Sequence, residues 1–253
     1  MALLITVGTG TVVPHPRRSS PAHWFAHGPV RLLMDCGAGT IHRLAQLGLP
    51  WNRLTHVALT HFHNDHVGEF PALLYAMKWG QEQHREEPLV VYGPAGTLGM
   101  LRALASGLGQ WVVEPGFPLE VREIGPADSV RLADDLVLTA HRTPHTEESL
   151  ALSLALAGSR LVYTGDTGPS DELADWARGC DLLLAECSLP DSRAIDMHLT
   201  PRQAGAMAAR AEAKRLVLTH LYPPVEEVDI VAQAREQYTG QVVVARDGST
   251  FTV

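Results

Sequence analysis

Short apolar segments rich in β-branched residues recur along the whole chain, and polar or helical stretches separate them. Segments of this kind predict buried strands, and their alternation with helical patterns predicts an α/β fold. Both halves run through strands, then a helix, then a further strand, which indicates a duplicated layout without a residue-level repeat. The predicted strands are 3–7, 30–35, 55–60, 89–92, 119–124, 136–140, 149–156, 160–164, 181–186, 215–219 and 241–246.

Three segments carry helix signals. Apolar residues between Phe70 and Met77 follow the i, i+3, i+4, i+7 spacing of one buried helix face. Thr200-Pro201-Arg202-Gln203 is a capping box with proline at the first helical position, so a helix is expected to start there. A third helix is expected over about 225–237. No low-complexity linker or block of charge divides the chain, so we expect a single domain over residues 1–253.

The composition excludes several classes of protein. Hydrophobic residues make up 45% of the chain and charged residues 19%, which is an ordinary globular balance. A net charge of −8 without a basic stripe argues against binding through a nucleic-acid phosphate backbone. No apolar run reaches the roughly 18–20 residues of a membrane helix, and the first residues lack the basic region of a secretion signal. We therefore expect a soluble, cytoplasmic protein.

Cysteine and glycine patterns exclude two further kinds of site. Cys36, Cys180 and Cys187 form no CxxC pair, so neither a disulfide framework nor a thiolate zinc cage is expected. Gly8-Thr9-Gly10 follows a predicted strand, but Val13 stands where a dinucleotide-binding loop needs its third glycine. The 13 histidines are more informative, because imidazole is the commonest metal ligand in proteins.

Four potential metal ligands crowd into six residues directly after the predicted strand that ends at Thr60. His61 and His63 alternate, so on an extended chain they project to one side. Asp65 and His66 follow where the backbone turns toward the next helix, and they can address a second point. Zinc takes imidazole nitrogen and carboxylate oxygen at about 2.0–2.2 Å, so two ligand pairs suit two metal ions rather than one.

The run HFHNDH at 61–66 resembles the signature of the metallo-β-lactamase superfamily. The resemblance implies a four-layer αββα sandwich in a single domain, with the metals at the rim between two sheets. It also implies further ligands after later strands, and matches stand at the ends of predicted strands: His145, Asp166 and His220. The implied arrangement places one metal on His61, His63 and His145, the second on Asp65, His66 and His220, and Asp166 between them.

Within the superfamily, the chain is most similar to the ribonuclease Z-like branch. The segments that carry this resemblance are Gly8-Thr9-Gly10 with Pro14 and Arg18-Ser19, Asp35-Cys36-Gly37-Ala38-Gly39-Thr40, and Glu186 with His198-Leu199-Thr200. In that branch a histidine two residues before a threonine serves the leaving oxygen of the substrate, and a glutamate orients it. The matching catalytic residues are His198 and Glu186, while Asp65 would orient the attacking water in addition to binding metal.

The chain departs from ribonuclease Z at one point. Ribonuclease Z carries a long arm that clamps transfer RNA, inserted between its third histidine and its bridging aspartate. Between His145 and Asp166 this chain has room only for a hairpin, predicted at 149–157 and 160–164. The missing arm and the net charge of −8 argue against folded tRNA as a partner. We therefore expect small phosphodiesters or other esters as substrates.

The resemblance thus implies a zinc-dependent hydrolase with two Zn²⁺ per chain, with Mn²⁺ or iron as alternatives, and it suggests a homodimer. Lactone or thioester hydrolysis on the same metals and true tRNA 3′ processing stay open as alternatives. Di-iron redox relatives carry a glutamate at the position of His63, and a metal-free binding module would have lost ligands that are all present here. His15, His23 and His27 are placed in a loop near the site.

Overall fold

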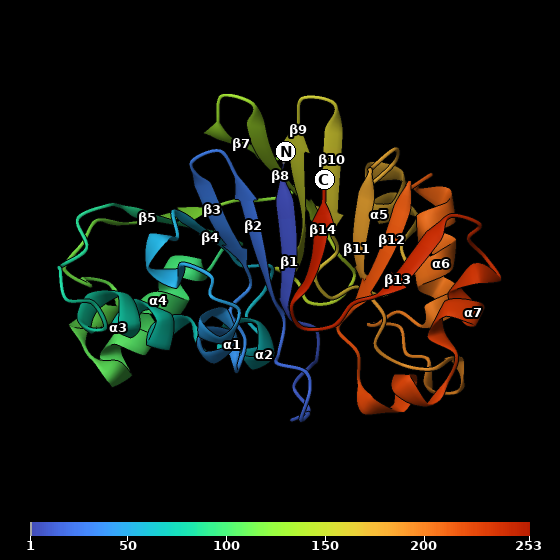
Figure 1. Cartoon of the computed structure of the whole chain (residues 1–253), viewed down its shortest axis with the longest axis horizontal. Helices are drawn as coiled ribbons and strands as arrows, with labels where there is room; N and C mark the ends of the chain where they lie inside the picture. Colours follow the sequence, from blue (N-terminus) through green and yellow to red (C-terminus); the bar gives the residue numbers. More distant parts are fainter. Residues whose placement is uncertain (1) are drawn as a thin grey trace.

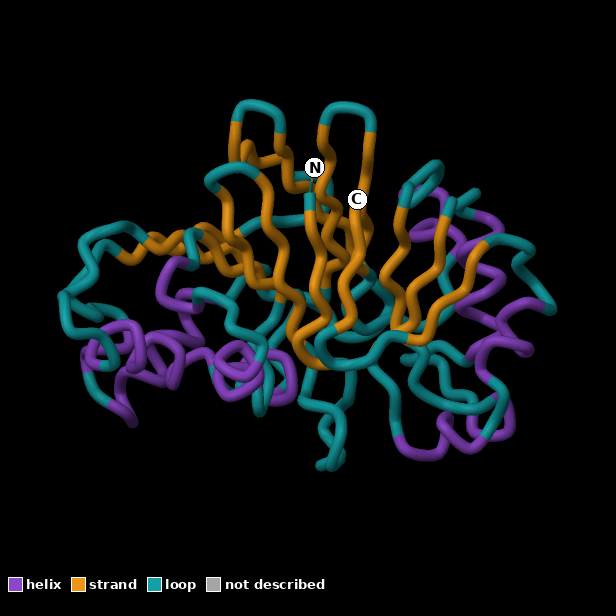
Figure 2. The backbone as a smooth tube through the Cα atoms, in the orientation of Figure 1, coloured by secondary structure: helices purple, strands orange, loops and turns teal. Residues whose placement is uncertain are grey.

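The computed structural model describes residues 2–253, which form two β-sheets packed face to face between two layers of helices. In Figure 1 the helices of the N-terminal half lie to the left of the sheets and those of the C-terminal half to the right. Figure 2 shows the same layers, with strands in the middle and helices outside. The architecture is the four-layer αββα sandwich that the sequence predicts.

Within the described residues, the strands form two sheets of seven. The first has the order β14 (Ser249–Thr252), β1 (Leu3–Gly8), β2 (Ala22–His27), β3 (Val30–Met34), β4 (His56–Ala58), β5 (Leu89–Gly93), β6 (Leu119–Glu123). The second has the order β13 (Gln241–Val244), β12 (Arg215–Thr219), β11 (Leu182–Glu186), β10 (Ser159–Tyr163), β9 (Leu150–Leu156), β8 (Leu136–Arg142), β7 (Ser129–Ala133). Each sheet contains three antiparallel pairs on one side and three parallel pairs on the other, which confirms the duplicated layout.

The helices cover the two outer faces. Those of the first half are α1 (Thr40–Gln46), α2 (Asn64–Val67), α3 (Phe70–Trp79) and α4 (Thr97–Leu108). Those of the second half are α5 (Asp171–Trp176), α6 (Pro201–Arg210) and α7 (Ile230–Arg235). The capping box that predicts α6 is confirmed, since Thr200 and Gln203 each accept a hydrogen bond from the other's backbone N–H. Among the described helices, none is both long and apolar enough to cross a lipid bilayer.

Three apolar layers hold the sandwich together. The central layer joins the inner faces of the two sheets and includes Leu32, Leu138 and Leu184. Leu73 of α3 packs on the outer face of the first sheet, and Met207 of α6 packs on that of the second. Each fully buried side chain of this size contributes roughly 1.5–3 kcal/mol. Because both faces of the sheets are covered, central strands such as β11 are buried at every position and read as continuous apolar runs.

The sequence interpretation is wrong at several points. It does not predict β2, β7 or β14, and His23 and His27 belong to β2 rather than to a loop. The β2 sequence AHWFAH lacks β-branched residues and forms a strand through its pairing with β1 and β3. The segment 225–237 is not one helix either. A 3₁₀ turn over Pro223–Glu227 precedes α7, which begins afresh where Asp229 caps it.

Candidate metal centre and active site

The predicted ligands gather at the edge of the sandwich where strands of both sheets end. The run 61–66 follows β4, His145 follows β8, Asp166 follows β10, and His220 follows β12. Strands β8, β10 and β12 run in the same direction, so their C-terminal ends meet at one rim. The strand-end positions that the sequence predicts for all of these residues are therefore confirmed.

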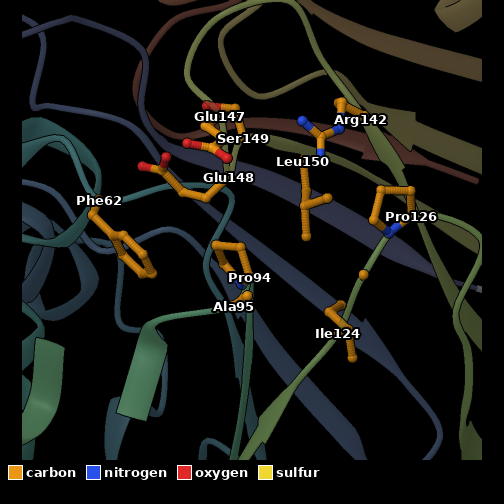
Figure 3. A pocket seen from close by; sticks show the side chains of 11 residues that line it. Phe62, Pro94, Ala95, Ile124, Pro126, Arg142, Glu147, Glu148, Ser149 and Leu150 are labelled. Atoms are coloured by element: carbon orange, nitrogen blue, oxygen red, sulfur yellow. The ribbon is translucent and has the colours of Figure 1, made fainter. Parts of the chain in front are cut away.

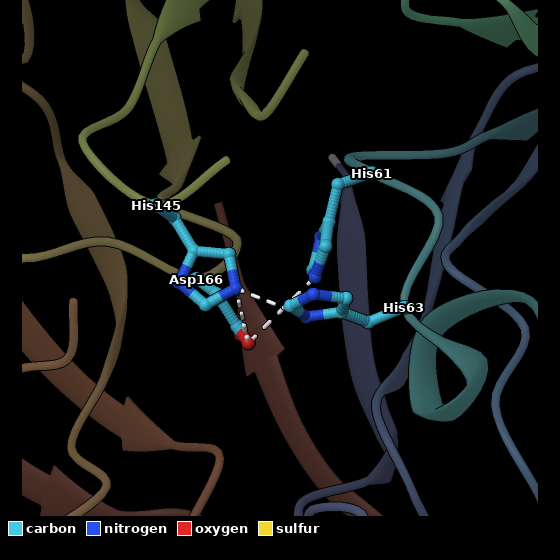
Figure 4. A group of neighbouring side chains, drawn as sticks. All are labelled: His61, His63, His145 and Asp166. Carbon is cyan, nitrogen blue, oxygen red and sulfur yellow. Dashed lines mark hydrogen bonds and ion pairs between the residues drawn. The ribbon is translucent and has the colours of Figure 1, made fainter. Parts of the chain in front are cut away.

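The first group contains His61, His63, His145 and Asp166 (Figure 4). Asp166 Oδ2 lies 3.8 Å from His61 Nε2 and 3.7 Å from His145 Nε2. His145 Nε2 in turn lies 3.1 Å from His63 Nδ1. One ligand atom from each residue lies within 4.8 Å of every other. Three imidazole nitrogens and one carboxylate oxygen thus surround a space of the size that one metal ion needs.

The second group contains Asp65, His66 and His220. His220 Nε2 lies 3.5 Å from Asp65 Oδ2. Asp166 approaches this group through its other oxygen, since Oδ1 lies 3.2 Å from His66 Nε2 and 3.3 Å from His220 Nε2. Asp166 therefore presents a different oxygen to each group. These two groups contain the residues of the two predicted ligand sets, and a third group that could hold an ion, Asp166, His198 and His220, overlaps with both.

Several atoms of the two groups are buried without a hydrogen-bond partner among the described residues. They are Nε2 of His61, His66 and His220, and Oδ1 of Asp166. An unpaired buried polar atom costs roughly 1–3 kcal/mol, so four at one point need an explanation. A bound cation satisfies all of them, and imidazole with carboxylate is a donor set that suits zinc and similar divalent ions. The residues present therefore fit divalent metal ions.

Hydrogen bonds to the opposite ring nitrogen hold the histidines in place. His145 Nδ1 donates to the carbonyl oxygen of Met197 at 3.0 Å, and His220 Nδ1 donates to Ser188 Oγ at 2.8 Å. These bonds place the proton on Nδ1 and leave the Nε2 lone pair directed at the centre. Ser188 Oγ donates its own hydrogen bond to Glu186 Oε2 at 2.6 Å, so its acceptor role toward His220 is fixed.

Asp35 supports the centre and was given no role by the sequence interpretation. This carboxylate is fully buried and accepts hydrogen bonds of 2.8 Å from His66 Nδ1, Thr60 N and Tyr163 Oη. Its backbone φ of +58° lies in the left-handed region, which costs a non-glycine residue roughly 1–2 kcal/mol. The signal in the sequence was an aspartate directly after a buried strand, but its partner His66 is distant along the chain.

Gly37 explains part of the motif that follows Asp35. A Cβ at Gly37 would lie 1.7 Å from the carbonyl oxygen of Asp65, so only glycine allows the two loops to approach. Next to it, Cys36 N donates to the carbonyl oxygen of His66 at 2.7 Å. The motif therefore holds the metal-binding loop against the end of β3.

The structure also brings His198 and Glu186 together. His198 Nδ1 lies 2.8 Å from Glu186 Oε1, and the His198 ring lies 4.9 Å from the ring of His145 and 5.5 Å from that of His220. Thr167 N donates to the same Glu186 oxygen at 2.7 Å and fixes the carboxylate. His198 thus borders the metal centre with its orientation set from behind.

The surroundings of Asp166 and His198 shift the pKa of both groups. Burial raises the pKa of Asp166, but His220 and His66 outweigh that effect and hold the pKa well below its usual range. Burial lowers the pKa of His198, yet the hydrogen bond and charge of Glu186 outweigh it and raise the pKa above the ordinary value. Asp166 is therefore ionised at neutral pH in a buried site, which is the condition for binding a metal ion.

This fold and this site define a class of protein, and the comparisons with known proteins agree. The family model "Beta-lactamase superfamily domain" matches residues 30–221, so the chain belongs to that superfamily. Ribonuclease Z of Mycobacterium bovis (strain BCG / Pasteur) is 30% identical over 98% of this chain and 96% of the relative.

Solved structures extend the comparison. Human tRNase Z, short form, is 25% identical with a TM-score of 0.82, and the match covers 99% of this chain and 99% of that chain. The metallo-β-lactamase fold protein YhfI from Bacillus subtilis has a TM-score of 0.86 at 23% identity over 99% of this chain and 98% of that chain, and it shows the likeness in fold. The chain is thus a metal-dependent hydrolase of the ribonuclease Z type. The roles of individual residues and the homodimer stay predictions.

Proposed function

We propose that this chain is a phosphodiesterase that holds two Zn²⁺ ions and cleaves small phosphodiesters. The observation that carries the proposal is the position of Asp166, whose two oxygens face two separate ligand groups. The proposed ligands are His61, His63 and His145 for one ion, Asp65, His66 and His220 for the other, and Asp166 for both. Manganese and iron accept similar ligands and are the alternatives that metal analysis distinguishes.

The protein groups around the centre have complementary roles. Two bound metal ions would supply Lewis acidity and would lower the pKa of an attacking water. Asp65 is buried beside His220 and can accept a hydrogen bond from that water, which orients it toward phosphorus. His198, held by Glu186, can protonate the leaving oxygen or offset its negative charge.

The region between His145 and Asp166 supports a small substrate. It contains only the end of the His145 loop and the hairpin of β9 and β10, so no long arm extends from this part of the chain. Binding of a large RNA needs several cationic contacts, and the chain carries 28 acidic against 20 basic residues. The names of the relatives, ribonuclease Z and tRNase Z, favour a second candidate, which is tRNA 3′ processing.

Metal analysis and a substrate screen test the proposal together. The zinc-loaded protein is assayed on a nitrophenyl phosphodiester, a lactone and a thioester, before and after chelation. We expect turnover of the diester that chelation abolishes and added Zn²⁺ restores. Hydrolysis of the lactone or thioester without the diester would assign an acyl hydrolase instead. Bound iron with a visible charge-transfer band would indicate the redox class.

A further inference from the structure

A pocket of about 460 Å³ is built partly on loops that also carry predicted metal ligands, although none of those ligands lines it (Figure 3). Phe62, which forms one wall, stands between His61 and His63 in the sequence. The segment Glu147–Leu150 forms another wall and follows shortly after His145. The pocket and the centre therefore share two loops. Its volume lies within the range of about 300–1,000 Å³ that is typical of small-molecule sites.

The walls of this pocket are mainly apolar. The apolar lining residues are Phe62, Pro94, Ala95, Ile124, Pro126 and Leu150. Ile124 and Leu150 also belong to the core between the two sheets, so the deep part of the pocket is rigid. Figure 3 draws Phe62 and Pro126 on opposite sides of the cavity. Apolar walls of this kind favour a flat apolar group, which can pack a face on the Phe62 ring.

The Phe62 wall is preformed. Gly96 has φ +101°, and a Cβ there would lie 3.3 Å from Phe62 Cε2, so the ring packs directly on the backbone of the turn after β5. Glu123 Oε1 accepts hydrogen bonds from Gly96 N at 3.1 Å and Leu98 N at 2.9 Å, and it holds this turn in place. Binding of a ligand on Phe62 therefore costs little entropy, because this wall is already ordered.

Three charged side chains surround the pocket: Arg142, Glu147 and Glu148. Arg142 and Glu147 are exposed, and Glu148 is half-buried. Together they offer guanidinium donors and carboxylate acceptors at the edge of an apolar slot. Their summed charge is negative, which disfavours a second phosphate group at this position. The combination matches a planar, uncharged ring with a hydrogen-bonding edge.

We propose that this pocket binds a nucleobase on one ester arm of the phosphodiester. This rests on the proposed function, because the pocket adjoins the scissile bond only if the metal centre cleaves a diester. Phe62 supplies the apolar face for the ring, and Glu148 accepts a hydrogen bond from a ring N–H. The negative rim selects a single nucleoside ester over an extended polynucleotide.

Three diesters with one shared leaving group provide the test. Methyl, phenyl and thymidine 5′ esters of p-nitrophenyl phosphate all release nitrophenolate, so they differ only in the arm offered to the pocket. For the zinc-loaded enzyme we expect kcat/KM to be roughly tenfold higher or more for the two aromatic arms, as for a base packed on an aromatic side chain. The thymidine ester should be the best of the three.

Variants distinguish the contribution of the pocket to turnover from that of the metal centre. Two variants on different loops, Phe62→Ala and Ala95→Glu, should each lower kcat/KM for both aromatic esters to the value for the methyl ester. The metal content should stay unchanged. Glu148→Gln should lower kcat/KM for the thymidine ester and leave the phenyl ester unaffected. Leu108→Ala, at the exposed C-terminal end of α4, is the matched control and should preserve all ratios.

The outcomes distinguish the two proposals. Equal kcat/KM for all three esters in the wild type, or unchanged ratios in both Phe62→Ala and Ala95→Glu, would overturn the nucleobase pocket. Absence of hydrolysis for every diester, including the methyl ester, would overturn the proposed function instead. A loss of kcat/KM in the pocket variants that is confined to the esters with aromatic arms supports both the nucleobase pocket and the proposed function.

Discussion

His198 Nδ1 lies 2.8 Å from Glu186 Oε1, and Glu186 is fully buried at the end of β11. The contact uses one ring nitrogen and leaves the other for the substrate. Glu186 cannot rotate away, because Thr167 N holds the same oxygen and Ser188 Oγ donates to the other. A rigid carboxylate behind an imidazole both orients the ring and stabilises its protonated form.

Replacing His198 with alanine should therefore slow turnover without loss of metal or fold. A general acid contributes typically 10²–10⁴-fold, and we expect a loss in that range for diesters with alkoxide leaving groups. The loss should shrink for nitrophenolate esters, which need no proton on departure. Turnover of both ester classes measures the difference, with His141→Ala as the control. An equal loss for both classes would indicate a positioning role for His198.

The geometry around Asp166 predicts the metal content of two variants. Wild-type protein should bind two metal ions per chain, because two ligand groups face separate oxygens of Asp166. Asp65→Ala removes one ligand of the second group and should leave about one ion bound. Asp166→Ala should loosen both ions together and abolish activity.

Metal analysis after dialysis against a weak chelator measures these contents, with the surface variant Glu172→Ala as the control. Full activity of either aspartate variant at saturating zinc would refute the ligand assignment.

Substrate size gives a third prediction. We expect efficient cleavage of small diesters and poor processing of precursor tRNA, since the His145–Asp166 region has no arm and the net charge is −8. The measurement is the turnover of both substrates across a salt series. A protein with few phosphate contacts shows a weak salt dependence of RNA binding. Tight, steeply salt-dependent cleavage of the precursor would show instead that scattered basic residues form an RNA-binding surface.

A fourth prediction concerns stability away from the active site. Burial, with a smaller contribution from Arg122, lowers the pKa of His56 to about 4, below the ordinary value of 6.5. Between these values the unfolded chain binds more protons than the folded chain. The contribution of neutral His56 is therefore present above about pH 6.5 and is lost as the pH falls toward about 4.

His56→Gln should make the free energy of unfolding less dependent on pH in this window. The side chain is partly exposed, so we expect a difference of about 1–2 kcal/mol rather than the full value of the shift. Urea unfolding at pH 7.5 and pH 4.5 measures it. Wild type and variant share the metal centre, so metal release cancels in the difference. Parallel pH profiles would contradict the prediction.

Residues close together in the sequence account for what could be predicted from it. The capping box at Thr200 is a contact between residues three apart, so it needs no tertiary structure. The continuous apolar run of β11 reflects burial on both faces, which any α/β sandwich imposes on a central strand. The ligand run 61–66 places four potential metal ligands within six residues, so the sequence alone predicts a metal site there.

The tertiary structure alone decided the features that join distant residues. β14 becomes a strand because it pairs with β1 at the opposite end of the chain, as Leu3 opposite Thr252 shows. Asp35 acquires its role from His66, which follows the neighbouring strand β4 of the same sheet, and from Tyr163, which only packing of the two sheets brings to it. The apolar pocket beside Phe62 has no counterpart in any local pattern, because its walls come from four separate loops and strands. Non-local packing fixes such contacts, and a periodicity measured along the chain does not record them.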